Sequence, residues 1–132
     1  MREIALVQAA LVLHQDLFNP DGHPNPLRGG CYIGSEALYH MTGGKERWVV
    51  CRAQVFEDDL ERIDHRPTGV THWYLRDRNN GAKLDVTESQ FGEREHLESE
   101  TKTGFLTAGL SKRAAVILKT ARRLAALEAA SV

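Results

Sequence analysis

Residues 70–87 read VTHWYLRDRNNGAKLDVT, and this stretch decides the fold because it predicts an antiparallel hairpin. The segment 70–77 is rich in β-branched and aromatic residues, which is typical of a strand, and 82–87 predicts a second strand. Between them, Asn79, Asn80 and Gly81 favour a tight turn. The chain is therefore expected to contain an antiparallel sheet.

The length of the turn determines which side chains share a face of this hairpin. If residues 78–81 form a four-residue loop, Asp77 pairs with Ala82, and His72 lies diagonal to Asp85 on the same face. A three-residue loop would put His72 and Asp85 on opposite faces, because side chains alternate along a strand. A site that needs both residues therefore predicts the longer loop.

Helical periodicity flanks the predicted sheet on both sides. Apolar side chains recur at helical spacing in residues 3–17 and again in residues 31–41, and the glycines that follow are suited to a left-handed helix end. Ser111 is a candidate N-cap for a closing helix. The predicted buried stripe of that helix consists of Ala114, Ile117, Leu118, Ala121, Leu124 and Leu127.

The remaining segments are expected to be strand and loop. Residues 19–30 hold three prolines and three glycines and predict a loop. Residues 47–56 predict a strand, and residues 57–69 predict a polar excursion with room for one helical turn. The order of two helices, three or four antiparallel strands and a closing helix is an α+β pattern, expected to form one domain over residues 1–132.

Composition limits the classes of protein to which the chain can belong. A hydrophobic fraction of 42% with 27% charged residues excludes a wholly disordered chain, and a formal net charge of -1 gives no general attraction to nucleic acid or an anionic membrane. No run approaches the roughly 20 apolar residues of a membrane span, and no signal sequence is recognised. Two cysteines fit a reducing cytosol, so a cytoplasmic location is expected.

Cys31 is the candidate nucleophile, because it begins a predicted helix. A cysteine attacks as its thiolate, a minority species for a free thiol with a pKa of about 8.5. A helix N-terminus and a nearby imidazole both stabilise a thiolate. His72, in the middle of a predicted strand, is the candidate base, and Asp85 in the next strand is the candidate that orients its ring.

Further residues are candidates for substrate binding. The oxyanion of the reaction is expected to accept from the backbone N–H of Cys31 and from one more donor, either Asn25 or a backbone group of the preceding loop. Gly29 and Gly30, before the cysteine, leave space for a substrate carbonyl, and Gly30 is the candidate binding residue. Trp73 either packs in the core or walls a substrate groove, and Gln90 either hydrogen-bonds near the site or ends a turn.

Each catalytic candidate also has a structural interpretation. Cys31 can be a buried thiol that packs as a small hydrophobe, His72 a strand histidine bonded to backbone, and Asp85 a carboxylate that caps the following turn. Cys51, within an apolar strand, is expected to pack in the core. The cysteines and histidines show no metal-ligand spacing, so neither a metal nor a cofactor is expected.

The order of these residues resembles the papain-like superfamily and, within it, the transglutaminase-like arrangement. In both, a cysteine at a helix start precedes a histidine in a strand and an aspartate in the following strand. Residues 29–32, Gly-Gly-Cys-Tyr, are similar to the Gly-Gln-Cys-Trp motif of that group, with Gly30 where the glutamine stands.

The chain also resembles small YunG-like bacterial and phage proteins over roughly residues 29–118. The resemblance rests on the helix-leading Cys31 and on four short motifs: His72-Trp73, Leu84-Asp85-Val86-Thr87 followed by Gln90-Phe91, GFLT at 104–107 and SKRA at 111–114.

The resemblance implies a papain-like α+β domain in which the N-terminal helix and the cysteine-bearing helix pack on a small antiparallel sheet, with a C-terminal amphipathic helix. With the triad Cys31-His72-Asp85, it implies a cysteine hydrolase of amidase, peptidase or deamidase type. Its substrate would be an amide, isopeptide or thioester in a peptide, a protein or a small molecule.

The alternative is a catalytically inactive binding or sequestering protein, phage-encoded and acting on a host factor. A third hypothesis is that the basic face of the C-terminal helix contacts an acidic partner.

Overall fold

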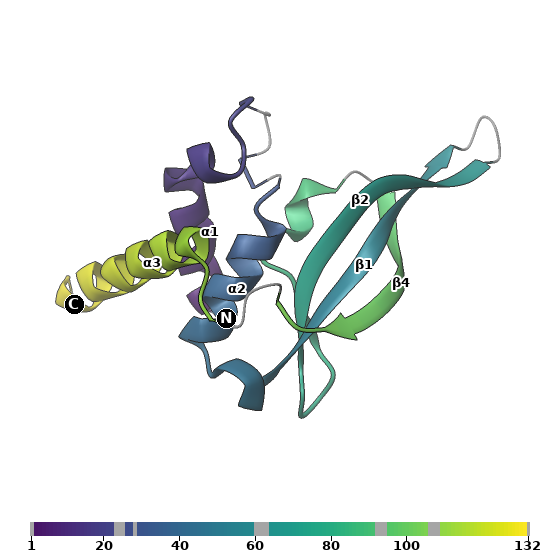
Figure 1. Cartoon of the computed structure of the whole chain (residues 1–132). Helices are drawn as coiled ribbons and strands as arrows, with labels where there is room; N and C mark the ends of the chain where they lie inside the picture. The colour runs from purple at the N-terminus through teal and green to yellow at the C-terminus, as the bar shows by residue number, and fades with distance from the viewer. Residues whose placement is uncertain are drawn as a thin grey trace.

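A computed structural model describes the backbone of residues 2–22, 26–27, 29–59, 64–91, 95–105 and 109–131. Within these residues the helices gather on one side of a curled antiparallel sheet (Figure 1). The α+β class expected from the sequence is confirmed. No helix in the described part of the chain is long and apolar enough to cross a membrane.

The sheet has the strand order β3-β2-β1-β4. Strands β1 and β2 form a long hairpin whose far end projects away from the helices (Figure 1). The elements, in chain order, are α1 (Arg2–Leu13), η1 (Gln15–Leu17), α2 (Cys31–Met41), η2 (Gly44–Glu46), β1 (Trp48–Asp59), β2 (Asp64–Asp77), β3 (Lys83–Leu84), η3 (Glu88–Gln90), β4 (Glu95–Thr103) and α3 (Lys112–Ala130).

The turn between β2 and β3 has the predicted length. The N–H of Asp77 donates to the carbonyl of Ala82 at 2.9 Å, which closes a four-residue loop over residues 78–81. Strand β3 then continues along β2 in the same register. The prediction that the longer loop brings His72 and Asp85 to one face is confirmed.

The helix boundaries follow local sequence signals. Cys31 begins α2 as predicted, and Gly43, with φ of 117°, follows its end. The Ser111 hydroxyl accepts a backbone N–H of the first turn of α3 at 3.3 Å, so the predicted N-cap is confirmed. Helix α1 ends at Leu13, and a separate 3-10 turn follows it where a single helix over residues 3–17 was expected.

The main core lies between the helices and one face of the sheet. Helix α2 lies in the middle of this arrangement, since it contacts α1, α3 and β2. Of the predicted stripe on α3, Leu127 is 62% exposed in a groove beside α1. The fully or nearly buried apolar residues of this core include Val7, Ala10, Leu11, Leu38, Trp48, Leu75, Val86 and Ile117.

The strands differ from the expectation in the most polar parts of the chain. Residues 57–59 and 64–69 continue β1 and β2, where a polar excursion was expected, and residues 60–63 lie outside the described part. Strand β4 falls in a segment that showed no apolar alternation. It lies at the edge of the sheet, where charged side chains remain in solvent and an apolar alternation is not required.

A buried carboxylate ties α2 to α3. Glu36 on α2 is 0% exposed, and its two oxygens accept the backbone N–H of Ser111 at 2.5 Å and the Ser111 hydroxyl at 2.8 Å. Because Ser111 caps α3, this contact joins the cysteine-bearing helix to the N-terminus of the closing helix. No pattern in the sequence distinguishes Glu36 from the exposed glutamates.

Candidate functional site

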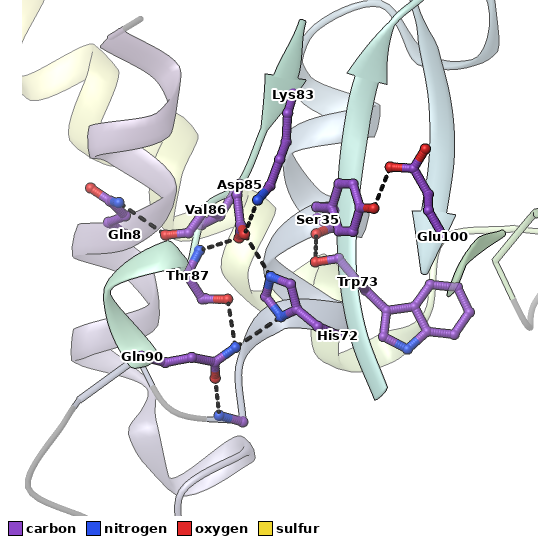
Figure 2. Close-up of polar contacts among 12 residues, drawn as sticks. Gln8, Ser35, His72, Trp73, Lys83, Asp85, Val86, Thr87, Gln90 and Glu100 are labelled. Atoms are coloured by element: carbon purple, nitrogen blue, oxygen red, sulfur yellow. Dashed lines mark hydrogen bonds and ion pairs between the residues drawn. The ribbon is translucent and has the colours of Figure 1, made fainter. Parts of the chain in front are cut away.

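The centre of the site is a buried pair formed by His72 on β2 and Asp85, which directly follows β3. Oδ2 of Asp85 lies 2.6 Å from Nε2 of His72 (Figure 2). The His72 and Asp85 side chains are 0% and 2% exposed. Oδ1 of the same carboxylate accepts the N–H of Thr87 at 3.2 Å, and Lys83 Nζ lies 3.8 Å from Oδ2. Asp85 therefore both orients the imidazole and caps the following turn.

Gln90, at the end of η3, contacts the other nitrogen of the ring. Its Nε2 lies 2.9 Å from Nδ1 of His72 and 3.3 Å from Oγ1 of Thr87 (Figure 2). Its Oε1 accepts the backbone N–H of Gly29 at 3.2 Å. Gln90 thus joins the histidine to the loop that precedes Cys31.

These contacts determine the tautomer of the neutral His72 ring. The Gly29 N–H fixes the orientation of the Gln90 amide, because the reverse orientation would set two donors against each other. The amide nitrogen of Gln90 can only donate, so in the neutral ring Nδ1 of His72 accepts and carries no proton. The proton is then on Nε2, where Asp85 accepts it.

Cys31 completes the constellation from the N-terminus of α2. Burial lowers the pKa of His72, but hydrogen bonding to Asp85 and to Cys31, together with the charges of both groups, raises that pKa above its ordinary value. The Cys31 thiol therefore lies near the ring. Its backbone N–H lies in the first turn of α2, where amides have no acceptor within the helix.

Cys31 lines a pocket with a volume of about 630 Å³, which is in the range of small-molecule sites. Gln90 lines the same pocket, whereas His72 lies behind this wall. Three aromatic rings and two carboxylates also contribute to the lining, from Tyr32, Trp73, Phe91, Glu57 and Glu95.

Trp73 and Ser35 hold α2 against β2 beside the pocket. Trp73 is 9% exposed and packs edge-on against Tyr32, with ring centroids 4.8 Å apart, so it belongs to both the core and the pocket wall. The hydroxyl of Ser35 donates to the Trp73 carbonyl at 3.2 Å. The small Ser35 side chain therefore permits a close approach of α2 to β2, whereas Gly34 faces Leu11 and Val86.

Gly30, a predicted binding residue, does not line the pocket. An added Cβ on Gly30 would meet the Phe18 ring at 3.2 Å and Leu11 at 3.4 Å, and its N–H donates to Leu27, so the space beside Gly30 is filled by the core. The expectation that Gly30 leaves room for substrate is wrong for this reason. Asn25 lies outside the described residues.

Gly29 takes the place expected for Gly30. It lines the pocket, its φ of 85° is left-handed, and an added Cβ would lie 2.8 Å from the Phe18 carbonyl oxygen. Only glycine fits this position, which aims the backbone N–H at Gln90. The glycine pair before Cys31 was the sequence signal for this donor.

A smaller group of buried residues lies on the face of the sheet that carries His72. Cys51 is fully buried there beside Ala53 and Tyr74, as expected of a core thiol. The Tyr74 hydroxyl donates to Glu100, and burial together with Glu100 raises the pKa of Tyr74. Among the described residues, no cluster of histidine, cysteine and carboxylate side chains could hold a metal ion.

The geometry supports proton exchange between a thiol and a buried, carboxylate-oriented imidazole at the wall of a pocket. Of the sequence candidates, Cys31, His72, Asp85, Trp73 and Gln90 come together. Comparisons with protein-family models, curated proteins and solved structures found no significant match to this chain.

Proposed function

We propose that this chain is a cysteine-dependent hydrolase with a papain-like core, which cleaves an amide, isopeptide or thioester bond. The observation that carries the proposal is the buried His72–Asp85 pair, 2.6 Å apart, beside a cysteine at a helix N-terminus in a pocket wall. The residue types and their order of contact are those of a nucleophile, a base and an orienting group.

In the first step, the thiol proton of Cys31 passes to Nδ1 of His72, and the sulfur attacks the substrate carbonyl carbon. The oxyanion accepts the Cys31 backbone N–H, and the N-terminus of α2 favours negative charge at this place. When the carbon–nitrogen or carbon–sulfur bond breaks, Nδ1–H of His72 gives its proton to the leaving amine or thiol. The product of this step is a thioester on Cys31.

In the second step, water attacks the thioester and gives a proton to Nδ1 of His72. The carbon–sulfur bond then breaks, the acid leaves, and the proton returns to the Cys31 sulfur. Asp85 accepts Nε2–H of His72 throughout, so Nδ1 remains the nitrogen that exchanges protons. An amine in place of water gives acyl transfer by the same steps.

Alkylation of Cys31 tests the proposal without knowledge of the substrate. We expect iodoacetamide to modify Cys31 at pH 6 to 7 faster than an unactivated thiol, because His72 can accept the thiol proton. Peptide-resolved mass spectrometry separates Cys31 from Cys51, which is fully buried and serves as an internal control. His72→Ala should slow the modification of Cys31.

An activated ester tests the covalent step. Incubation with 4-nitrophenyl acetate should add one acetyl group to Cys31, visible by intact mass, and Cys31→Ala should lose it. If Cys31 reacts no faster than a free thiol and His72→Ala does not change its rate of modification, the protein is not a cysteine hydrolase. That result would favour the binding or sequestering protein.

A further inference from the structure

Gln90 covers the base of the candidate site. His72 is 0% exposed, and the pocket wall in front of it includes Gln90, whose amide nitrogen lies 2.9 Å from Nδ1. A base must reach to within about 2.6–3.2 Å of the proton that it transfers. A leaving group in the pocket therefore cannot reach Nδ1 while Gln90 stays in place.

The Gln90 contact also opposes protonation of the ring. Nδ1 has one in-plane lone pair, and the Gln90 amide donates to it. Transfer of the Cys31 proton to Nδ1 would place the new N–H of His72 against the amide N–H of Gln90. Reversal of the amide would relieve this clash but would place its NH₂ group against the Gly29 N–H. Formation of the thiolate–imidazolium pair is thus coupled to departure of Gln90.

The same side chain covers a hydrogen-bond donor of the pocket. Oε1 of Gln90 accepts the Gly29 N–H, and the Gln90 nitrogen lies at the base. A scissile amide needs this same pair of contacts, with its oxygen on a backbone donor and its nitrogen on the histidine. The carboxamide of Gln90 therefore occupies the position in which a substrate amide would react.

We propose that Gln90 makes an autoinhibitory contact, in which its carboxamide occupies the amide position of the site until a substrate displaces it. Its departure frees Nδ1 of His72 and the Gly29 N–H together, and Gly29 then supplies the second donor to the oxyanion. This inference rests on the proposed function of Cys31 and His72. It assigns to Gln90 a regulatory role and to Gly29 a catalytic contact.

The charged and titratable groups around His72 are known from the described contacts. Asp85, with Lys83 beside it, faces Nε2; Cys31 faces the ring from α2; and Tyr74 stacks on the ring at a centroid distance of 5.8 Å. Substitution of Gln90 leaves all four side chains in place. A change in the pH dependence of Cys31 can then be assigned to the lost amide.

The test measures the rate of Cys31 alkylation by iodoacetamide between pH 5.5 and 8.5. Gln90→Met keeps the length of the side chain and removes the amide, and Gln54→Met is the matched control at an exposed position outside the pocket. We expect Gln90→Met to raise the rate at pH 6 by about fivefold or more, the factor expected for one ordinary hydrogen bond. The gain should shrink towards pH 8.5, because an ordinary thiol ionises at this pH without a base.

Gln90→Glu gives a second, nearly isosteric variant whose carboxylate accepts from Nδ1–H, and it should also raise the rate at pH 6. Circular dichroism verifies that each variant is folded. If Gln90→Met raises the alkylation rate by the same factor at every pH, Gln90 only shields the Cys31 sulfur. If the variant leaves the rate unchanged or lowers it, Gln90 does not oppose ionisation of the Cys31 thiol. Either result overturns the autoinhibitory contact.

The failure of this inference is distinguishable from failure of the proposed function. If His72→Ala slows alkylation at pH 6 but Gln90→Met does not accelerate it, activation of Cys31 by His72 is supported and the autoinhibitory contact is refuted. If His72→Ala has no effect, the proposed function itself fails, and the autoinhibitory contact fails with it.

Discussion

Asp85 Oδ2 lies 2.6 Å from His72 Nε2, although the two residues are on opposite arms of a hairpin and no strand pairing joins them directly. The four-residue loop over residues 78–81 gives the register, and the chain then leaves β3 so that the Asp85 side chain turns towards the ring. Both side chains are almost completely buried. A hydrogen bond between a charged and a neutral group in such surroundings contributes more than one at the surface.

Asp85→Asn should weaken both the site and the fold. The amide keeps the shape of the carboxylate but removes the charge that stabilises the imidazolium, so we expect Cys31 alkylation at pH 6 to fall by about tenfold or more. Loss of the charged acceptor should lower the free energy of unfolding by about 1.5–3 kcal/mol, measured by urea denaturation.

Asp16→Asn is the matched control for that prediction, because Asp16 is exposed on η1. It should leave both the alkylation rate and the unfolding free energy unchanged. Equal alkylation by Asp85→Asn and the native protein would contradict an orienting role for Asp85.

The stability contributed by His72 should depend on pH. The pKa of His72 is raised in the native state, because hydrogen bonding to Asp85 and Cys31 outweighs the opposing effect of burial. The native state therefore binds the proton more tightly than the unfolded state. The resulting stabilisation is fully present below the unfolded-state pKa of about 6.5 and is lost as the pH rises through the higher native pKa.

Urea denaturation of the native protein and of His72→Gln at pH 5.5 and pH 8 measures this effect. The difference in unfolding free energy between the two proteins should be larger at pH 5.5. A difference that is equal at both pH values, or larger at pH 8, would show that folding does not raise the pKa of His72.

Local patterns were sufficient to predict the parts of the site that depend on strand register and helix ends. The alternation of side chains and the length of the Asn-Asn-Gly turn put His72 and Asp85 on one face, and the glycines before Cys31 marked the start of α2. Both features are determined within a few residues of chain, so a single sequence contains them.

Contacts between distant segments could not be predicted in this way. Gln90 and Gly29 are 61 positions apart, and their hydrogen bond depends on how η3 packs against the loop before α2. Both glycines before Cys31 were expected to leave space for the substrate carbonyl. Only the left-handed φ of Gly29 and the Phe18 ring beside Gly30 distinguish them.

Gly34→Ala should disturb the site through the core. An added Cβ would lie 3.0 Å from Leu11 Cδ1 and 3.3 Å from Val86 Cγ1, in a region where Val86 is 1% exposed. Overpacking of this kind costs about 1–3 kcal/mol. Val86 directly follows Asp85, so the strain should also lower Cys31 alkylation at pH 6.

The control for Gly34→Ala is Gly104→Ala, where an added Cβ meets no atom within 4 Å. Thermal unfolding and the alkylation assay should both separate the two variants. A Gly34→Ala protein with native stability and native alkylation would mean that α1 and α2 move apart without consequence for Asp85.

The Glu36–Ser111 contact should stabilise the position of α2, and a double-mutant cycle measures this contribution. Glu36→Gln keeps one acceptor but sets an amide N–H near the Ser111 donors, so we expect a loss of about 1.5–3 kcal/mol in unfolding free energy. Ser111→Ala removes the N-cap of α3 as well, at about 0.5–2 kcal/mol. Because the two residues share their hydrogen bonds, the double variant should lose less than the sum of the single losses.

Glu46→Gln, at an exposed position of η2, is the control, and it should leave the unfolding free energy unchanged. If the losses of the two single variants add up strictly in the double variant, Glu36 and Ser111 contribute to stability independently.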